Sequence, residues 1–215
     1  PQGNFLEELK QLTVENGSLL IADEVMTGFR SKFGGAQELL NVAADITCLG
    51  KVIGGGLPVG AYGARNEIMA MVAPLGEMYQ AGTLSGNPIT MAAGISTLNE
   101  LKRQNPYEKF SYIAHTIQTY LENSAEKHGI EITVNRFGSM MNPFFTNKKV
   151  NNLKDAQTSD QGKFAIFFWE MLRNGVFLPP SQFEAWFLSS AMTGRDMKNI
   201  EKAIDKGMIA VSNSM

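Results

Sequence analysis

Apolar and polar residues alternate along the first part of the chain with two different periods. Between residues 4 and 16 the apolar positions recur at the spacing of an amphipathic helix. Nearly continuous apolar runs follow at 18–23 and 45–50, a pattern typical of buried parallel strands with helices on both faces of the sheet. Residues 57–64 predict a further strand, which Pro58 interrupts. We therefore expect an α/β architecture in this part of the chain.

A helix with recognisable ends closes the first part. Pro88 favours the first position of a helix, and Asn87 before it is a suitable cap. The helical pattern continues to about Arg103, with Ile89 on the side that we expect to be buried. The polar break at residues 104–106 then predicts a domain boundary.

The second part, residues 105–215, mixes helices and short strands. Its predicted elements are a helix over 107–128, strands at 131–134 and 140–146, a loop over 147–157, a helix from Ser159 or Asp160 to about 174, strands at 176–178 and 186–190, and a last helix capped by Thr193 and Asp196. This order predicts an α+β domain after the α/β domain of residues 1–104.

Composition narrows the class of protein. The chain has 215 residues and 44% hydrophobic content, which is enough for a packed core. Its net charge of -2 gives no reason to expect nucleic acid or a membrane as a partner, and no apolar run approaches the ~18 residues of a spanning helix. The single cysteine, Cys48, reads as a core residue and fits a reducing compartment, so we expect a cytoplasmic protein. Because the chain begins at Pro1 and runs directly into a helical pattern, we expect the later part of a longer protein.

Two polar residues end apolar runs and are the main candidates for chemistry. Asp23 closes the run 18–23, and Lys51 follows the run 45–50. Ligands of open α/β sheets bind beyond the carboxyl ends of strands, where an amine can react with an aldehyde cofactor and an acid can hold a proton on its ring nitrogen. The ordinary alternatives are a cap or an ion pair with Arg30 for Asp23, and a solvated side chain for Lys51.

Other motifs carry weaker signals. The three glycines after Lys51 fit neither common phosphate-binding pattern. The small residues of 82–88 stand before a helix and could bind an anion, although an ordinary capped helix start is the more common meaning. His115 and His128 have no partner pattern and are expected at the surface or at a helix end, and no Cys/His spacing predicts a metal site.

The segments around Asp23 and Lys51 resemble the class III, pyridoxal-phosphate-dependent aminotransferase family. Residues 21–30, Ile-Ala-Asp-Glu-Val-Met-Thr-Gly-Phe-Arg, resemble the family's segment at the cofactor nitrogen, and residues 50–63 resemble the segment with the cofactor-bonded lysine. Residues 78–88 and 175–184 are similar to members that move an amino group within one molecule. The resemblance covers the whole chain.

The resemblance implies fold type I of these enzymes. Residues 1–104 would be the latter part of the large cofactor-binding α/β domain, and residues 105–215 the small C-terminal α+β domain. It also implies a homodimer, a small-molecule substrate, and a cofactor that alternates between pyridoxal 5'-phosphate and pyridoxamine 5'-phosphate.

The resemblance also implies roles for individual residues. Lys51 matches the lysine that bonds the cofactor and then serves as acid and base. Asp23 matches the acid on the ring nitrogen, and Val25 the residue packed against the ring. Gly82 and Thr83 match the segment that reaches the cofactor phosphate of the opposite subunit.

Glu184 matches an active-site acid of the family, whereas Met192 stands where the family's pattern leads us to expect histidine. Family members are roughly twice this length, and the phosphate loop, the stacking aromatic, the carboxylate-binding arginine and the lid of the other half have no counterpart here. Two alternatives follow: an aminotransferase acting between an ω-amine and a keto acid, and an inactive fragment.

Overall fold

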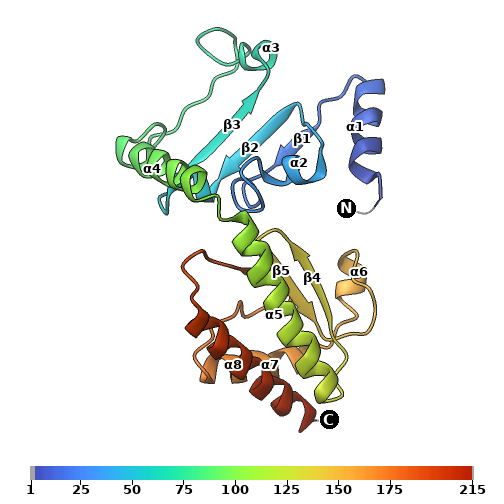
Figure 1. The fold of residues 1–215 in the computed structure, drawn as a ribbon. Coiled ribbons are helices and arrows are strands. Elements are labelled where there is room, and N and C mark those ends of the chain that lie inside the picture. The colour runs from blue at the N-terminus through green and yellow to red at the C-terminus, as the bar shows by residue number, and fades with distance from the viewer. Residues whose placement is uncertain (1–2, 215) are drawn as a thin grey trace. The chain divides into compact units, whose positions relative to one another are not determined.

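The fold comes from a computed structural model that describes residues 3–214 (Figure 1). The chain forms two compact units, the first ending at Asn105 and the second beginning at Pro106. Each unit has its own three-stranded sheet. No helix within residues 3–214 has the length and apolar character needed to cross a membrane.

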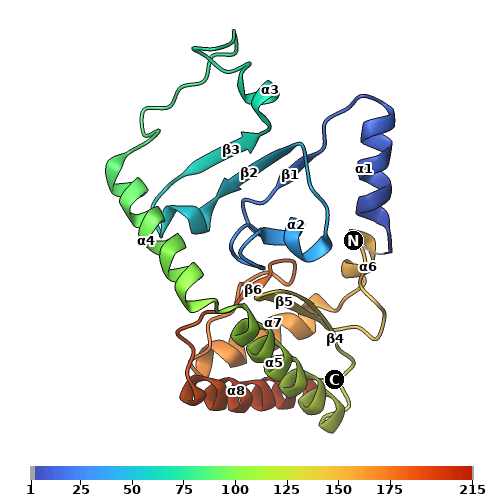
Figure 2. The ribbon, with the colours of Figure 1, turned by 45° about the horizontal axis from the view of Figure 1, so that its top comes forward.

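The first unit alternates helices and strands around a mixed sheet. Its elements are α1 (Phe5–Glu15), β1 (Ile21–Asp23), α2 (Gly35–Leu40), β2 (Ile46–Gly50), the 3-10 helix η1 (Lys51–Gly54), β3 (Gly60–Ala64), α3 (Asn66–Met69) and α4 (Pro88–Gln104). The strand order is β1-β2-β3, and Figure 2 shows β2 between its two neighbours. β1 runs parallel to β2, and β3 runs antiparallel to it with Gly60 opposite Gly50.

The start of α4 follows the prediction. The side chain of Asn87 accepts hydrogen bonds from the backbone N–H groups of Ile89 (3.0 Å) and Thr90 (3.3 Å), which have no partner within the helix. Asn105 ends the helix in the left-handed region at φ 43°, and its N–H bonds the carbonyl of Leu101.

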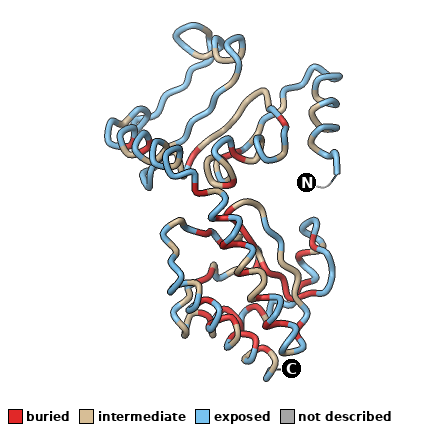
Figure 3. Tube along the Cα trace, viewed as in Figure 1, coloured by how far each residue is buried: buried red, intermediate tan, exposed pale blue. Residues whose placement is uncertain are grey.

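The expected burial of the first unit is wrong. Ile21 on β1 is 58% exposed, and Ile89 on α4 is 71% exposed. Cys48 is partly exposed instead of lying in a core. The physical reason is that a strand is buried only where neighbouring layers cover it, and the residues of this chain leave much of the small sheet uncovered, as the pale blue of Figure 3 shows.

The second unit is an antiparallel sheet with helices packed on it. Its elements are α5 (Tyr107–Lys127), β4 (Thr133–Phe137), β5 (Met140–Phe144), α6 (Leu153–Ala156), α7 (Gln161–Arg173), β6 (Trp186–Phe187) and α8 (Gly194–Ser212). The strand order is β4-β5-β6, with Asn135 opposite Asn142 and Met141 opposite Trp186. The α+β expectation is thus met in this unit.

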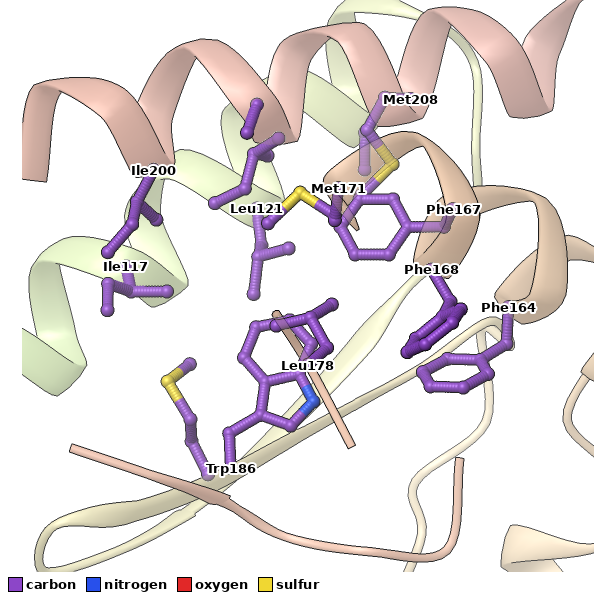
Figure 4. Close-up of a cluster of buried hydrophobic side chains, with 14 of the residues drawn as sticks. Ile117, Leu121, Phe164, Phe167, Phe168, Met171, Leu178, Trp186, Ile200 and Met208 are labelled. Atoms are coloured by element: carbon purple, nitrogen blue, oxygen red, sulfur yellow. The ribbon is translucent and has the colours of Figure 1, made fainter. Parts of the chain in front are cut away.

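A continuous apolar core holds the second unit together. Figure 4 shows side chains of α5, α7 and α8 meeting Trp186 and Leu178. Phe167 is fully buried, stacks with Trp186 at 6.4 Å between ring centroids, and meets Phe145 edge-on at 5.6 Å. Because a large buried side chain is worth about 1.5–3 kcal/mol relative to exposure, this cluster is the main source of stability in the unit.

Two local predictions for this unit are wrong. Residues 176–178 form no strand, because the N–H of Val176 bonds the carbonyl of Met171 (2.9 Å) and closes the end of α7 after Gly175 at φ 80°. The expected loop over 147–157 contains the short helix α6, whose first turn is capped by Asn152.

Candidate active site

The first unit brings the ends of β1 and β2 to one edge of its sheet. The two strands are parallel, and Asp23, the last residue of β1, lies opposite Cys48. Lys51 follows three positions later, directly after the end of β2. The amine and the carboxylate therefore leave neighbouring strands at the carboxyl edge, where open α/β sheets bind their ligands.

Lys51 has an unusual backbone. Its φ of 48° lies in the left-handed region, which is sparsely populated for a residue with a long side chain and costs on the order of 1–3 kcal/mol. The side chain is exposed, and no residue between 3 and 214 forms a hydrogen bond or an ion pair with its amine. Such strain concentrates at functional sites, and the sequence analysis did not foresee it.

The turn after Lys51 is fixed by α4. Gly55 ends η1 at φ 59°, and a Cβ atom added there would lie 2.6 Å from the carbonyl oxygen of Ala93. A Cβ on Gly94 would overlap the carbonyl oxygen of Ile53. The glycines at this turn and on α4 therefore allow close packing of backbone on the helix.

Asp23 and Val25 lie together at the end of β1. The N–H of Val25 donates to Oδ1 of Asp23 (2.9 Å), and the aspartate remains exposed. A Cβ on Gly50 would lie 3.2 Å from Cγ1 of Val25, which shows that the valine packs over the backbone that leads into Lys51. An acid, an amine and an apolar side chain are thus gathered on adjacent strand ends.

Glu24 is a structural residue of this site that the sequence analysis missed. It is 2% exposed, and its carboxylate accepts hydrogen bonds from the N–H groups of Ala36 (2.9 Å) and Gln37 (2.8 Å) and from the hydroxyl of Thr27. Its neighbour Gly35 has φ 73° and no space for a Cβ atom beside the carboxylate. This single side chain ties the loop that follows Asp23 to the start of α2.

Gly82 and Thr83 lie in an exposed turn before α4. The N–H of Ser85 bonds the carbonyl of Gly82 (2.9 Å), and a Cβ on Gly82 would lie 2.7 Å from the serine oxygen. Gly82 also lines a groove of about 860 Å³ with mostly apolar walls from β3, the segment after α3, and α4. Lys51 and Asp23 do not line this groove, so within this chain Gly82 and Thr83 are not gathered around the amine.

Glu184 belongs to the second unit. It closes a turn in which its N–H bonds the carbonyl of Ser181 (3.1 Å), and its carboxylate is exposed. His128 ends α5 as expected, with Nε2 3.0 Å from Oδ1 of Asp205. Among the described residues no group of His, Cys, Asp and Glu side chains could hold a metal ion.

A strong electrostatic perturbation in the first unit lies directly before β2, at Asp45. Asp45 accepts hydrogen bonds from Lys10 (2.7 Å) and from the N–H of Leu20 (2.8 Å), and Arg65 lies 3.0 Å away. These contacts, with that of Lys10 the largest, lower the pKa of Asp45 to about 2. The ion pair between Lys10 and Asp45 joins α1 to the sheet at the start of β2, which is the end opposite to Lys51.

Comparison with known proteins gives consistent matches over the chain. The class-III aminotransferase family profile matches residues 1–204. The glutamate-1-semialdehyde 2,1-aminomutase of Pelotomaculum thermopropionicum is 53% identical over 203 residues, which are 94% of this chain and 47% of that protein. The enzyme of the same name from Aquifex aeolicus is 50% identical over 206 residues, which are 96% of this chain and 48% of that protein.

A solved structure also matches. The PLP internal aldimine form of the Sphingopyxis sp. MTA144 FumI protein superposes with a TM-score of 0.82 at 26% identity, covering 99% of this chain and 48% of that one. The chain therefore spans about half the length of the relatives and of the structure that it matches.

Proposed function

We propose, since the chain belongs to the class-III aminotransferase family, that it forms part of a pyridoxal-phosphate-dependent 2,1-aminomutase that converts glutamate-1-semialdehyde to 5-aminolevulinate. The observation that carries this proposal is the amine of Lys51 and the carboxylate of Asp23 at one edge of a parallel strand pair. The names of relatives at 50–53% identity support this choice of reaction within the family.

The residues present fit the cofactor. Lys51 offers an amine without a competing partner among residues 3–214, and Asp23 an exposed carboxylate on the neighbouring strand. Val25 adds an apolar surface next to Gly50 that suits a flat aromatic ring. Gly82 and Thr83 are proposed to contact the phosphate of a cofactor held by a second subunit of a homodimer.

The protein's part in the reaction is to place and hold protons. When bound, pyridoxal phosphate supplies an electron sink for the carbanion of the substrate. Asp23 would keep a proton on the ring nitrogen through direct charge pairing. Lys51 would carry a proton between the substrate carbon and the cofactor carbon as acid and base, and Glu184 is assigned as a further active-site acid.

This assignment extends to the two units. Residues 1–104 are proposed to be the latter part of the large cofactor-binding domain, and residues 105–215 the small C-terminal domain. The reaction leads to tetrapyrroles, and a cytoplasmic location is proposed for the enzyme. The isolated chain is expected to be inactive, since it spans about half the length of the relatives.

An aminotransferase acting between an ω-amine and a keto acid is the second candidate. The match of the class-III aminotransferase profile to residues 1–204 favours this candidate less than the 50–53% identity to relatives named 2,1-aminomutase favours the mutase. A mutase needs no keto-acid acceptor, so dependence of turnover on such an acceptor would decide for the transferase.

The decisive experiment uses the complete enzyme, meaning a protein that contains this chain and the remaining half of the family's length. Lys51→Ala should lower kcat by more than about a hundredfold and remove the visible absorbance of the lysine-bound cofactor. Lys102→Ala, an exposed lysine on α4, is the matched control and should keep both. Near-normal turnover of Lys51→Ala would refute the assignment.

A further inference from the structure

The turn that carries Glu184 is attached to the second unit through one buried residue, Gln182. Gln182 is 3% exposed, whereas the next residue, Phe183, is 44% exposed and Glu184 is open to solvent. The turn itself is closed locally, since the N–H of Phe183 bonds Oγ of Ser181 (3.2 Å) and the N–H of Glu184 bonds the Ser181 carbonyl. Local bonds shape the turn, but they do not fix it to the rest of the unit.

Gln182 supplies that attachment through both its side chain and its backbone. Its Nε2 donates to Oγ of Ser159, a buried hydroxyl two residues before α7. Its carbonyl oxygen accepts from Nδ2 of Asn142 on β5 at 2.9 Å. The N–H of Asp160 bonds the carbonyl of Phe145 (3.1 Å), which joins the Ser159 segment to the end of the same strand. The anchor therefore reaches two rigid elements of the core.

The hydrogen bond between Gln182 and Ser159 can be removed by substitutions that keep the unit folded. Oε1 of Gln182 and Oδ1 of Asn142 are buried and have no hydrogen-bond partner among the described residues. A methionine at position 182 would remove the Nε2 bond together with the unpaired oxygen, in a side chain of similar length. Gln182→Met alone leaves the buried Ser159 hydroxyl unpaired, whereas Gln182→Met combined with Ser159→Ala removes both partners and is nearly neutral for stability. The turn then keeps only the bond from Asn142 to its backbone.

We infer that Gln182 is a positioning residue, which acts through its bond to Ser159 to hold Glu184 in the orientation needed for the reaction. This inference rests on the proposed role of Glu184 as an active-site acid. The wider principle is that a site on a loop is held in a productive geometry only when supporting side chains lock it.

The first test measures the turn directly. In the isolated chain, Gln182→Met should raise amide hydrogen exchange at Phe183 and Glu184 about three- to tenfold, the range expected for loss of one neutral hydrogen bond. Ser159→Ala removes the partner instead and should act on the same amides. Gln118→Met, at a partly buried glutamine whose side chain bonds Glu122 on its own helix, is the matched control. Unchanged exchange in both test variants would overturn the inference, whatever the enzyme's activity.

The second test separates positioning from a general structural role. In the complete enzyme, Gln182→Met combined with Ser159→Ala, which removes both partners of the bond, should lower kcat/KM about three- to tenfold with little change in melting temperature. In a Glu184→Gln background the same pair of substitutions should have no further effect, because the residue through which it acts is already lost. Independent, multiplying losses would overturn the inference. If the proposed function itself is wrong, the wild-type enzyme will not isomerise glutamate-1-semialdehyde.

Discussion

Glu24→Gln is the substitution that most directly tests how the loop after Asp23 is held. The carboxylate of Glu24 uses Oε1 for the N–H of Gln37, and Oε2 for the N–H of Ala36 and the hydroxyl of Thr27. A glutamine has only one acceptor oxygen, so its NH₂ group must face at least one of these donors. The hydroxyl of Thr27 can rotate to accept instead, but a backbone N–H cannot.

At least one backbone N–H at the start of α2 is therefore left without a partner. An unpaired, largely buried donor costs about 1–3 kcal/mol, which corresponds to a factor of about 5–150 in the local opening equilibrium. Native-state hydrogen exchange of Ala36 and Gln37 should accelerate by that factor. Glu77→Gln, at an exposed acid outside α2, is the matched control and should change these rates much less.

Exchange of both amides within twofold of the parent protein would refute this account of Glu24. The consequence for chemistry can be measured separately. Asp23 and Val25 stand directly before and after Glu24 in the chain. The complete enzyme with Glu24→Gln should therefore bind pyridoxal phosphate more weakly, by a factor no larger than the increase in the hydrogen-exchange rates of Ala36 and Gln37.

Three further predictions concern other parts of the molecule. Gly94→Ala would overlap the carbonyl of Ile53 and should destabilise the first unit by about 1–3 kcal/mol in denaturant unfolding. Asp205 has a pKa below its ordinary value of 3.8, mainly because Lys127 and then His128 and Ser124 bond it. Asp205→Asn should therefore destabilise the second unit at pH 7. The difference in melting temperature should begin to shrink near pH 4, where the carboxylate of the unfolded chain binds a proton, and should vanish as the pH falls through the lower pKa of the folded protein. Asp23→Asn in the complete enzyme should lower both cofactor affinity and turnover more than about tenfold, which equilibrium titration and steady-state kinetics would measure.

The helices could be predicted closely because their signals are local. Pro88 with Asn87 and the reciprocal pair Thr193 and Asp196 bond the backbone within one turn, so four adjacent residues contain the whole cause. Burial could not be predicted in this way. The run that contains Ile21 predicts a covered strand, but coverage depends on distant segments.

The residues of the candidate site also differ in whether local sequence signals predict them. The placement of Asp23 and Lys51 at one edge follows from two apolar runs and the rule for parallel strands. Glu24 and Gln182 could not be recognised, because a polar residue in a loop is usually solvated. Their partners lie 12 and 23 residues away in the sequence, and only the folded chain brings them together.

The geometry of Lys51 depends on α4 as much as on the strand before it. A lysine keeps a left-handed backbone conformation only where its surroundings fix the backbone on both sides. Before it, Gly50 passes under Val25, and after it, η1 is pressed against α4 by contacts that leave no space for a Cβ on Gly55 or Gly94. Gly94→Ala should therefore change more than stability. If α4 fixes the position of the Lys51 amine, this distant substitution must also slow the covalent reaction of Lys51 with pyridoxal phosphate. If β2 alone fixes that position, the rate of this reaction should equal that of the parent protein.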